Sequence, residues 1–335
     1  MDNVVKKVGF VGTGIMGAPI AGHILDAGYE VAVYNRTASK CAPLVERGAR
    51  LAATPAEAAE GADLVLTMVG YPSDVEDVYL GENGILAAAR KGAYLVDLTT
   101  SSPTLARELH DAAEVEDKHA FDCPVTGGEA GAVAGTLTLI LGADEAYAAP
   151  VLPVLETFSS KVCYFGRAGA GQTAKLCNQI SLASCMVGMA DALTFAEVCG
   201  LDKGQMLEMV GSGMGSSRAL TDLGPRAAAG DWAPGFLVEH LRKDLGLALA
   251  EADDQELTLP GAETAYTLYD LLCQVGGSRL GTQAIELLYS EEEEGAAAGL
   301  DWSVLDHLEE EDEHECHCGH DHDHGEGCCH HHHEG

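Results

Sequence analysis

Basic and aromatic residues are scarce in this sequence. Lys and Arg together number 19 of 335 residues, against 53 Asp and Glu, so the formal net charge is −34. A chain with so few positive charges binds a phosphate backbone poorly, which argues against nucleic acid as a partner. Aromatic residues make up only 5%, whereas alanine and glycine are plentiful, a composition that fits helices packed closely on a sheet.

The sequence also has no apolar run long enough to cross a bilayer. The longest, Ile180–Ala190, stops at Asp191, well short of the roughly 20 residues that a spanning helix needs. Seven of the eleven cysteines are scattered between Cys41 and Cys273 without paired spacing. This pattern is typical of reduced, mostly buried thiols, so we expect a cytoplasmic protein with no membrane partner.

A glycine-rich turn follows the first apolar strand, Lys7–Val11, and opens a helix that leads to a second strand, Glu30–Tyr34. Gly12 permits a tight turn, Gly14 lets the backbone approach a pyrophosphate, and Gly17 lets the helix pack on the strand. Phosphate then meets the free N–H groups of the helix N-terminus. This order predicts a dinucleotide-binding domain. The turn reads Gly12-Thr13-Gly14-Ile15-Met16-Gly17.

The end of the second strand favours NADP(H) over NAD(H). An NAD site has Asp or Glu there for the ribose 2′-OH, whereas this chain has Asn35-Arg36-Thr37. With no carboxylate to repel it, a 2′-phosphate could bind the guanidinium of Arg36 and the hydroxyl of Thr37. We therefore predict NADP(H) as the preferred cofactor, with NAD(H) possible. The alternative is that Arg36 stacks on adenine or faces solvent.

Strands and helices continue to alternate. Further strands are expected at Asp63–Val69, Ala93–Leu98 and His119–Asp122, and a helix capped by Ser73 or Asp74 follows the first of them. Repeated βαβ units predict a doubly wound, mostly parallel sheet. Ligands of such sheets lie at the carboxyl ends of the strands. Three loops fall there: Val69-Gly70, Thr99-Thr100 and Thr126-Gly127-Gly128.

The stretch from Gly169 to Gly200 contains no proline and is apolar on nearly every face, which predicts one long buried helix. A polar stripe at helical spacing marks its first turns. A lysine on a buried helix is costly without a task or a partner. We therefore predict that Lys175 is the acid/base of a nicotinamide-dependent dehydrogenase, the alternative being a surface lysine on an exposed turn. The stripe consists of Gln172, Lys175, Asn178 and Gln179.

Together these motifs resemble the β-hydroxyacid dehydrogenase family of 3-hydroxyisobutyrate dehydrogenase, tartronate semialdehyde reductase and glyoxylate/succinic semialdehyde reductase. The resemblance covers about residues 6–290 and includes GFVGTGIMG, GYEVAVYNRT, FDCPVTGGEAGAVAGTLTLILG, GAGQTAKLCNQ and LRKDLGLALAEA. It implies an α/β protein with a Rossmann-type domain over residues 1–167. An all-helical domain over residues 168–290 would be joined to it by the long helix, and the chain would form a homo-oligomer, a dimer or tetramer.

The resemblance also implies roles for matching positions. Lys175 looks like the catalytic lysine, and Asn178 like the asparagine that holds the substrate near it. Thr126, Gly127 and Gly128 fall where members usually have Ser-Gly-Gly, the loop that binds the substrate carboxylate. Cys123 stands where alanine is common, so it packs as a small apolar side chain or places an oxidisable thiol near the site. Cofactor contacts are implied for Val69, Gly70, Asp74, Thr100, Phe236 and Lys243.

These roles predict hydride transfer between NADP(H) and a short β-hydroxy acid or its semialdehyde, a small-molecule carboxylate. Lys175 would exchange the proton of the reacting oxygen. Burial and a cationic nicotinamide would both lower its pKa from the free value near 10.4. Two other functions stay open: reduction of an imine or a larger keto acid, and metal binding by an inactive dehydrogenase scaffold.

Residues 291–335 form the third expected part, an acidic tail with sixteen acids and no Lys or Arg. Its start, EEEEGAAAG, is interpreted as a linker, LDWSVLDHL as a short amphipathic turn, and the rest as disordered. Its thiols and imidazoles predict a heterogeneous site for Zn²⁺, Ni²⁺ or Cu⁺ without a catalytic role. The alternatives are a residual purification tag and an inert tail. The candidate ligands are Cys316, His317, Cys318, His320, His322, His324, Cys328 and Cys329.

Overall fold

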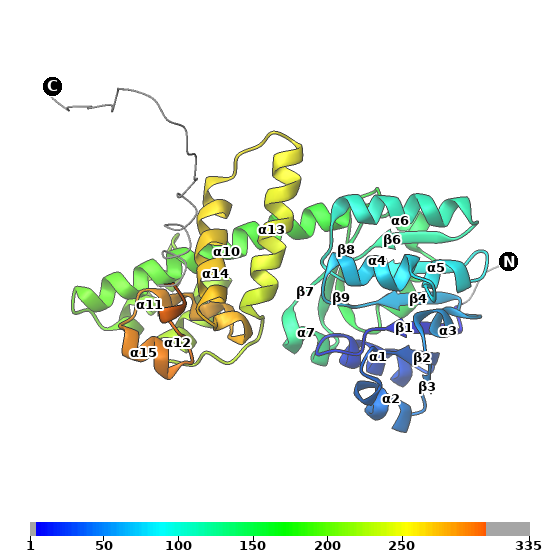
Figure 1. Cartoon of the computed structure of the whole chain (residues 1–335), viewed down its shortest axis with the longest axis horizontal. Coiled ribbons are helices and arrows are strands. Elements are labelled where there is room, and N and C mark those ends of the chain that lie inside the picture. The colour runs from blue at the N-terminus through cyan, green and yellow to red at the C-terminus, as the bar shows by residue number, and fades with distance from the viewer. Residues whose placement is uncertain (1–4, 306–335) are drawn as a thin grey trace, which may run out of the picture.

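Two units joined by one long helix make up residues 5–305, the part of the chain that the computed structural model describes (Figure 1). The first unit is a sheet covered by helices, and the second contains helices only. This is the α/β architecture predicted from the sequence, with an N-terminal parallel sheet and a large helical domain. The eight candidate metal ligands between residues 316 and 329 lie outside the described residues.

Six parallel strands form the main sheet, in the order β3-β2-β1-β4-β5-β6. The order reverses between β1 and β4, and ligands of open α/β sheets bind beside such a reversal. Every residue of β4 is buried, because helices cover both faces. The strands are β1 (Lys7–Val11), β2 (Glu30–Tyr34), β3 (Arg50–Leu51), β4 (Leu64–Thr67), β5 (Tyr94–Asp97) and β6 (His119–Asp122).

Alternate residues along the strands pack in two separate hydrophobic cores, one on each face of the sheet. Leu64 and Leu66 of β4 pack in the core that includes Phe10 and Ile20, whereas Val65 points to the opposite face and packs with Leu95. This two-residue period is what a doubly covered sheet requires. The helices are α1 (Gly17–Asp26), η1 (Ala38–Cys41), α2 (Ala42–Glu46), α3 (Pro55–Ala59), α4 (Pro72–Leu80), α5 (Ile85–Ala88) and α6 (Pro103–Val115).

A small second sheet contacts both β6 of the main sheet and the long helix through its strand β8. β8 pairs antiparallel with β7 and parallel with β9, so these strands do not extend the main sheet. The two-residue strand β7 was not predicted, since its alternation is too short to detect. The elements are β7 (Val125–Thr126), α7 (Gly128–Ala134), β8 (Leu137–Leu141), α8 (Glu145–Ala148), α9 (Leu152–Leu155) and β9 (Ser159–Tyr164).

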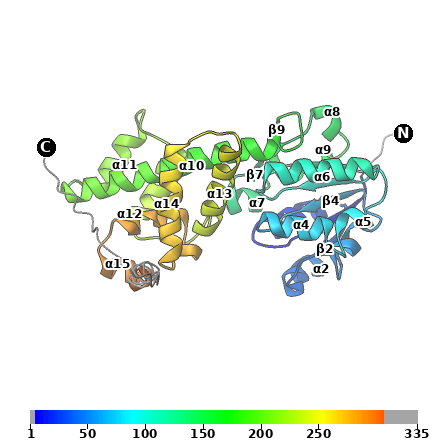
Figure 2. The same cartoon turned by 45° about the horizontal axis from the view of Figure 1, so that its top comes forward.

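Helix α10 (Ala170–Val198) runs from the sheet domain through the helical domain (Figures 1 and 2). Its length and composition would also suit a membrane span, but it is the central helix of a folded core, packed against α12, α13 and α14. The remaining elements are α11 (Lys203–Gly211), α12 (Arg218–Ala228), α13 (Val238–Asp254), α14 (Pro260–Gln274), η2 (Gly277–Arg279), η3 (Thr282–Leu288) and α15 (Glu292–Ala297).

Three local predictions are wrong. The cysteines between Cys41 and Cys273 are not mostly buried, since only Cys41 and Cys123 of the seven are. The expected linker after residue 290 is helix α15, because glutamates in a first turn stabilise a helix N-terminus and alanine favours helix. Beyond it, Leu300 is 5% exposed and packs in the core of the helical domain, so residues 291–305 belong to that domain. Helix α4 begins at Pro72, and Asp74 does not cap it from outside: its carboxylate accepts the N–H of Tyr71 from the third helical position (3.2 Å).

Candidate active site

The glycine turn has the geometry that a dinucleotide needs. Gly12 has φ +101°, and a Cβ there would lie 2.1 Å from the carbonyl oxygen of Met68. A Cβ on Gly17 would lie 1.9 Å from the carbonyl oxygen of Gly12, whereas Gly14 faces open space. Helix α1 begins behind Met16 without a side-chain cap. The Ala18 N–H donates to the Gly14 carbonyl (3.0 Å) and Pro19 has no N–H, so the N–H groups available to an anion are those of the turn ahead of Ala18. Ile15, at the tip of the turn, is 58% exposed.

The segment after β2 reaches both this turn and α4. Asn35 accepts the Thr13 N–H at its Oδ1 (3.1 Å) and donates from Nδ2 to the Thr37 carbonyl (3.1 Å), so its amide fixes the shape of the turn. Arg36 is exposed, and its guanidinium lies 3.3 Å from the Asp74 carboxylate. The structure thus brings two predicted cofactor contacts, Arg36 and Asp74, into contact with each other.

Gln172 attaches the start of α10 to the carboxyl end of β5. Its side chain is fully buried. The Ser101 N–H donates to its Oε1 (2.9 Å), and its Nε2 donates to the Thr99 carbonyl (2.7 Å). Both ends of the amide are satisfied by one loop, so the polar stripe of α10 is held in a fixed register against the sheet. Lys175 lies about one turn further along the same face.

Asp122, at the end of β6, was not singled out from the sequence. Its two carboxylate oxygens accept the N–H groups of Gly169 and Gln172, each at 2.7 Å, so it caps α10 from another element. Burial raises the pKa of Asp122, while these backbone donors oppose the rise. Gly142 and Gly171 leave room for this carboxylate, since a Cβ at either would lie within 3 Å of it. The bonds span about fifty residues, so local spacing gives no signal for them.

Lys175 is 8% exposed, which excludes the alternative of a surface lysine. Burial is the main reason that its pKa falls to about 8; nearby Lys243 lowers it further, and Asp244 opposes the change. Within residues 5–305 no hydrogen bond engages its Nζ. An amine with a lowered pKa and no fixed partner can take or give a proton near neutral pH.

The polar stripe of α10 continues into α13. Asn178 donates from Nδ2 to Gln179 Oε1 (2.8 Å), and Gln179 donates from Nε2 to Asp244 Oδ2 (2.6 Å). Asp244 is 1% exposed, and its Oδ1 lies 3.1 Å from Lys243 Nζ, an ion pair without hydrogen-bond alignment. Asp244 was given no role from the sequence. It is the buried anion between two lysines.

Lys243 connects the helical domain to the sheet domain. Its Nζ donates to the carbonyls of Thr100 (2.6 Å) and Gly70 (3.2 Å) and lies 5.9 Å from the ring centroid of Tyr71. His240, one turn earlier on α13, lies between the rings of Tyr71 and Phe236, with centroid separations of 6.4 and 6.2 Å. The predicted cofactor loops at β4 and β5 therefore meet α13. Val69 belongs to the same cluster through its N–H, which donates to Thr99 Oγ1 (3.0 Å).

The predicted carboxylate loop follows β6 and faces the segment before α13. Gly127 and Gly128 have φ +133° and +62°, conformations that favour glycine. Both are exposed, Thr126 is half-buried, and the Cβ position of Gly128 lies 3.7 Å from the Gly235 carbonyl oxygen. Cys123, just before the loop, is fully buried, and burial raises the pKa of its thiol well above normal. That favours the apolar packing role over the oxidisable one.

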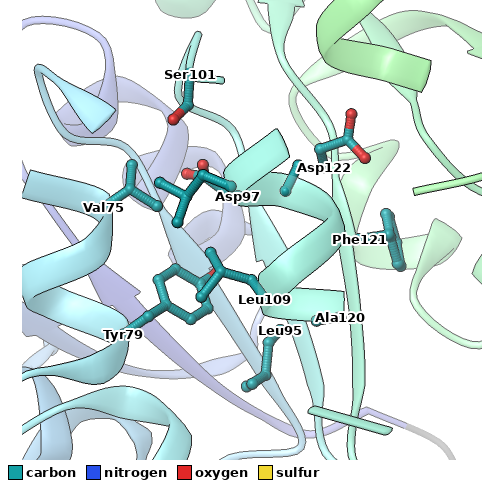
Figure 3. A pocket seen from close by; sticks show the side chains of 11 residues that line it. Val75, Tyr79, Leu95, Asp97, Ser101, Leu109, Ala120, Phe121 and Asp122 are labelled. Carbon is teal, nitrogen blue, oxygen red and sulfur yellow. The ribbon is translucent and has the colours of Figure 1, made fainter. Parts of the chain in front are cut away.

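Figure 3 shows the side chains that line a small cavity, which come mainly from β5, β6, α4 and α6. Its volume is about 10 Å³, near the lower limit for one water. Asp97 and Ser101 line it, and the Ser101 hydroxyl has no partner within the described residues. Asp97 accepts the Thr67 hydroxyl (2.6 Å) and the Thr99 N–H (3.1 Å), yet burial raises its pKa to about 6. This cavity is too small for a substrate.

Lys175, Asn178, Gly70, Thr100 and Lys243 thus come together where α10 and α13 meet the carboxyl ends of the strands. Residues 5–305 contain no cluster of three His, Cys, Asp or Glu side chains placed to hold a metal ion. The arrangement fits proton transfer beside a dinucleotide.

Two family models match consecutive parts of the chain. The one described as the NAD binding domain of 6-phosphogluconate dehydrogenase matches residues 7–166, and the one described as NAD-binding of NADP-dependent 3-hydroxyisobutyrate dehydrogenase matches residues 169–289. Both descriptions name a nicotinamide cofactor, and their junction falls at the glycine-rich start of α10.

Individual relatives match over 84% or more of their length. A probable 3-hydroxyisobutyrate dehydrogenase-like protein of Arabidopsis thaliana is 43% identical over 282 residues, 84% of each chain. The 3-hydroxyisobutyrate dehydrogenase of Pseudomonas aeruginosa is 35% identical over 294 residues, 85% of this chain and 99% of that one. The solved structure of Mycobacterium tuberculosis 3-hydroxyisobutyrate dehydrogenase with L-serine is 31% identical, with a TM-score of 0.80 over 86% of this chain and 100% of that one.

Proposed function

Because this chain belongs to the β-hydroxyacid dehydrogenase family and is an NAD(P)-dependent hydroxyacid dehydrogenase, we propose that Lys175 is its general acid/base. The substrate is a short β-hydroxy acid or its semialdehyde, of the 3-hydroxyisobutyrate, 2-hydroxy-3-oxopropionate, glyoxylate or succinic semialdehyde type. The observation that carries the proposal is the buried Nζ of Lys175, which has a lowered pKa and makes no hydrogen bond within residues 5–305.

The nicotinamide ring, when bound, supplies the hydride donor or acceptor. In oxidation, Lys175 Nζ removes the proton of the reacting hydroxyl; in reduction, it returns a proton to the carbonyl oxygen. Asn178 orients the substrate beside it, and its own amide is oriented by Gln179. Asp244 offsets part of the positive charge of the two lysines and keeps the pKa of Lys175 from falling further.

The carboxylate preference rests on the loop of Thr126, Gly127 and Gly128. Glycines without side chains let backbone N–H groups approach a carboxylate. The methyl group of Thr126 narrows this loop relative to serine, which favours small acids. L-serine, named with the M. tuberculosis neighbour, is itself a short β-hydroxy carboxylate.

The test of the proposed chemistry is replacement of Lys175. Lys175→Ala and Lys175→Arg should nearly abolish turnover, because neither can exchange a proton at neutral pH, while NADPH affinity stays within a few-fold. A screen of NADPH and NADH oxidation with glyoxylate, succinic semialdehyde, tartronate semialdehyde and methylmalonate semialdehyde identifies the substrate. Unchanged kcat in both variants would remove Lys175 from the mechanism.

We propose NADP(H) as the preferred cofactor, with NAD(H) accepted less well. Support comes from the absence of a carboxylate directly after β2 and from the exposed guanidinium of Arg36, which can leave Asp74 for a 2′-phosphate. Arg36→Ala should lower kcat/KM for NADPH at least tenfold and leave that for NADH nearly unchanged. Equal loss with both cofactors would reject this role.

The remaining proposals concern an alternative reaction, the tail, the cellular location and the oligomeric state. The imine-reductase alternative is tested by the same screen extended to cyclic imines and larger keto acids. We propose that Zn²⁺, Ni²⁺ or Cu⁺ binds to the side chains of Cys316, Cys318, Cys328, Cys329 and the neighbouring histidines. Titration calorimetry that detects no heat of binding for any of these ions would reject this proposal. Removing residues 306–335 should leave activity intact, which would exclude metal binding as the sole function. A cytoplasmic location and a dimeric or tetrameric state also stay proposals.

A further inference from the structure

A second cavity lies in the helical domain, between α10, α11, α12, η3 and α15. In Figure 1, helices α11, α12 and α15 lie at the end of the molecule away from the sheet domain. Its volume is about 50 Å³, several times the roughly 10–15 Å³ that one water needs. Thr194 on its wall lies 19 residues beyond Lys175 on α10, about 28 Å along a straight helix. The cavity is therefore separate from the proposed active site.

Negative charge dominates this cavity. Three carboxylates line it, those of Glu197, Glu286 and Glu294, against the single ammonium of Lys203. Lys203 Nζ lies 2.8 Å from Glu197 Oε2 and 3.2 Å from Glu286 Oε1. The last turn of the eleven-residue helix α12 also lines the cavity, and the carbonyl end of a helix favours a cation.

One buried oxygen has no partner. Glu286 is 7% exposed, and its Oε2 accepts no hydrogen bond within residues 5–305. Burial is the first cause of the raised pKa of Glu286, and repulsion from Glu197 and Glu294 adds to it, although Lys203 pulls the pKa down. The single ammonium group of Lys203 therefore does not compensate the negative charge of the three carboxylates. Leaving a buried acceptor without a hydrogen bond is unfavourable, so among the described residues the site lacks a donor for this oxygen.

We propose that this cavity binds a small organic ammonium ion, with the –NH₃⁺ group donating to Glu286 Oε2. A metal ion fits less well, because no three acidic side chains among the described residues are placed to hold one. An organic cation also uses the rest of the lining, since Trp232 offers an aromatic ring and Leu287 an apolar wall. Residues 291–335 contain no Lys or Arg, so the acidic tail cannot supply the ammonium group itself.

The test is titration calorimetry and thermal shift on the full chain saturated with NADPH. The probes are methylammonium, 1,4-diaminobutane, K⁺ and Mg²⁺ as chlorides at equal ionic strength. One of the two amines should bind with 1:1 stoichiometry, a Kd below about 1 mM and a raised Tm. Glu286→Gln should weaken binding at least tenfold and Glu294→Gln about threefold. Glu208→Gln, an exposed acid of α11 outside the cavity, is the matched control.

Glu294 is exposed, so its variant keeps the test valid if Glu286→Gln does not fold. Three results would overturn the proposal. Amine binding that is the same in both cavity variants would place the amine at the tail or the active site. Saturable binding of K⁺ or Mg²⁺ in preference to both amines would identify a metal-ion site. Absence of saturable binding by any probe would mean that the cavity holds water only.

Discussion

Lys243 Nζ, on the helical domain, donates to the carbonyl of Thr100, on the sheet domain, at 2.6 Å. The same ammonium reaches the Gly70 carbonyl and the Asp244 carboxylate. One side chain thus fixes α13 against two loops at which we place the cofactor. A rigid junction of this kind orders binding loops before the ligand arrives, which lowers the entropic cost of binding.

We therefore expect Lys243→Met to weaken NADPH binding about tenfold or more, because charge-assisted hydrogen bonds contribute about 1.5–3 kcal/mol each. Methionine keeps most of the side-chain length and removes the charge. Fluorescence titration with NADPH measures the change. Lys161→Met, an exposed lysine on β9, is the control, and equal affinities in the two variants would reject the role of Lys243.

The pH dependence of catalysis should follow Lys175. With a pKa of about 8, the neutral amine is the base for oxidation, so kcat/KM for the hydroxy acid should rise with pH and level off above about 8. The protonated amine is the acid for reduction, so kcat/KM for the semialdehyde should fall above the same pH.

Two neighbours should move that inflection in opposite directions. Lys243 lowers the pKa of Lys175 and Asp244 raises it. The inflection should therefore move up in Lys243→Met and down in Asp244→Asn, each read from initial rates between pH 6 and 10. If the pH–rate profiles of wild type, Lys243→Met and Asp244→Asn coincide, a group other than Lys175 controls the rate.

Gln172 should act as a positioning residue. Gln172→Leu fills the same space but leaves the Ser101 N–H and the Thr99 carbonyl buried without partners, at about 1–3 kcal/mol each. We expect a lower Tm. We also expect kcat to fall at least tenfold, because α10 would no longer hold Lys175 in a fixed position against the sheet. The pH of the inflection should stay unchanged. Cys177→Ala, an exposed position on the same helix, should change neither. Full kcat in a folded Gln172→Leu variant would show that the register does not depend on this amide.

The parts of the fold that depend on short-range pattern were predictable from the sequence. The glycine turn, the alternating strands and the long helix are local features, and the structure confirms them. The burial of Lys175 was also inferable, since apolar residues surround the stripe on α10. The individual site assignments stay predictions until cofactor and substrate are seen.

Long-range contacts were not predictable in this way. Asp122 caps a helix that begins 48 residues later, and Asp244 receives its hydrogen bond from Gln179 on another helix. Neither spacing has a local signature. The helix after residue 290 was missed for a different reason, because a run of glutamates looks like a solvated linker until Leu300 gives it a core to pack on.

Asp97 should make the stability of the sheet domain depend on pH. Its folded pKa, about 6, lies above its ordinary value of 3.8. The folded state therefore binds more protons than the unfolded state between about pH 4 and 6, and stability falls as pH rises through that window. At neutral pH the ionised, buried carboxylate costs on the order of 3 kcal/mol.

Asp97→Asn removes this cost while its carbonyl oxygen still accepts from Thr67 and Thr99. Relative to wild type, the variant should gain stability progressively from pH 4 to 6, measured by urea unfolding at closely spaced pH values. Asp111→Asn, an exposed acid on α6, is the control and should follow wild type throughout. The unfolding free energies of wild type and Asp97→Asn could instead differ by the same amount at every pH between 4 and 7. Asp97 would then ionise at its ordinary pKa, because its hydrogen-bond donors offset the desolvation of the carboxylate.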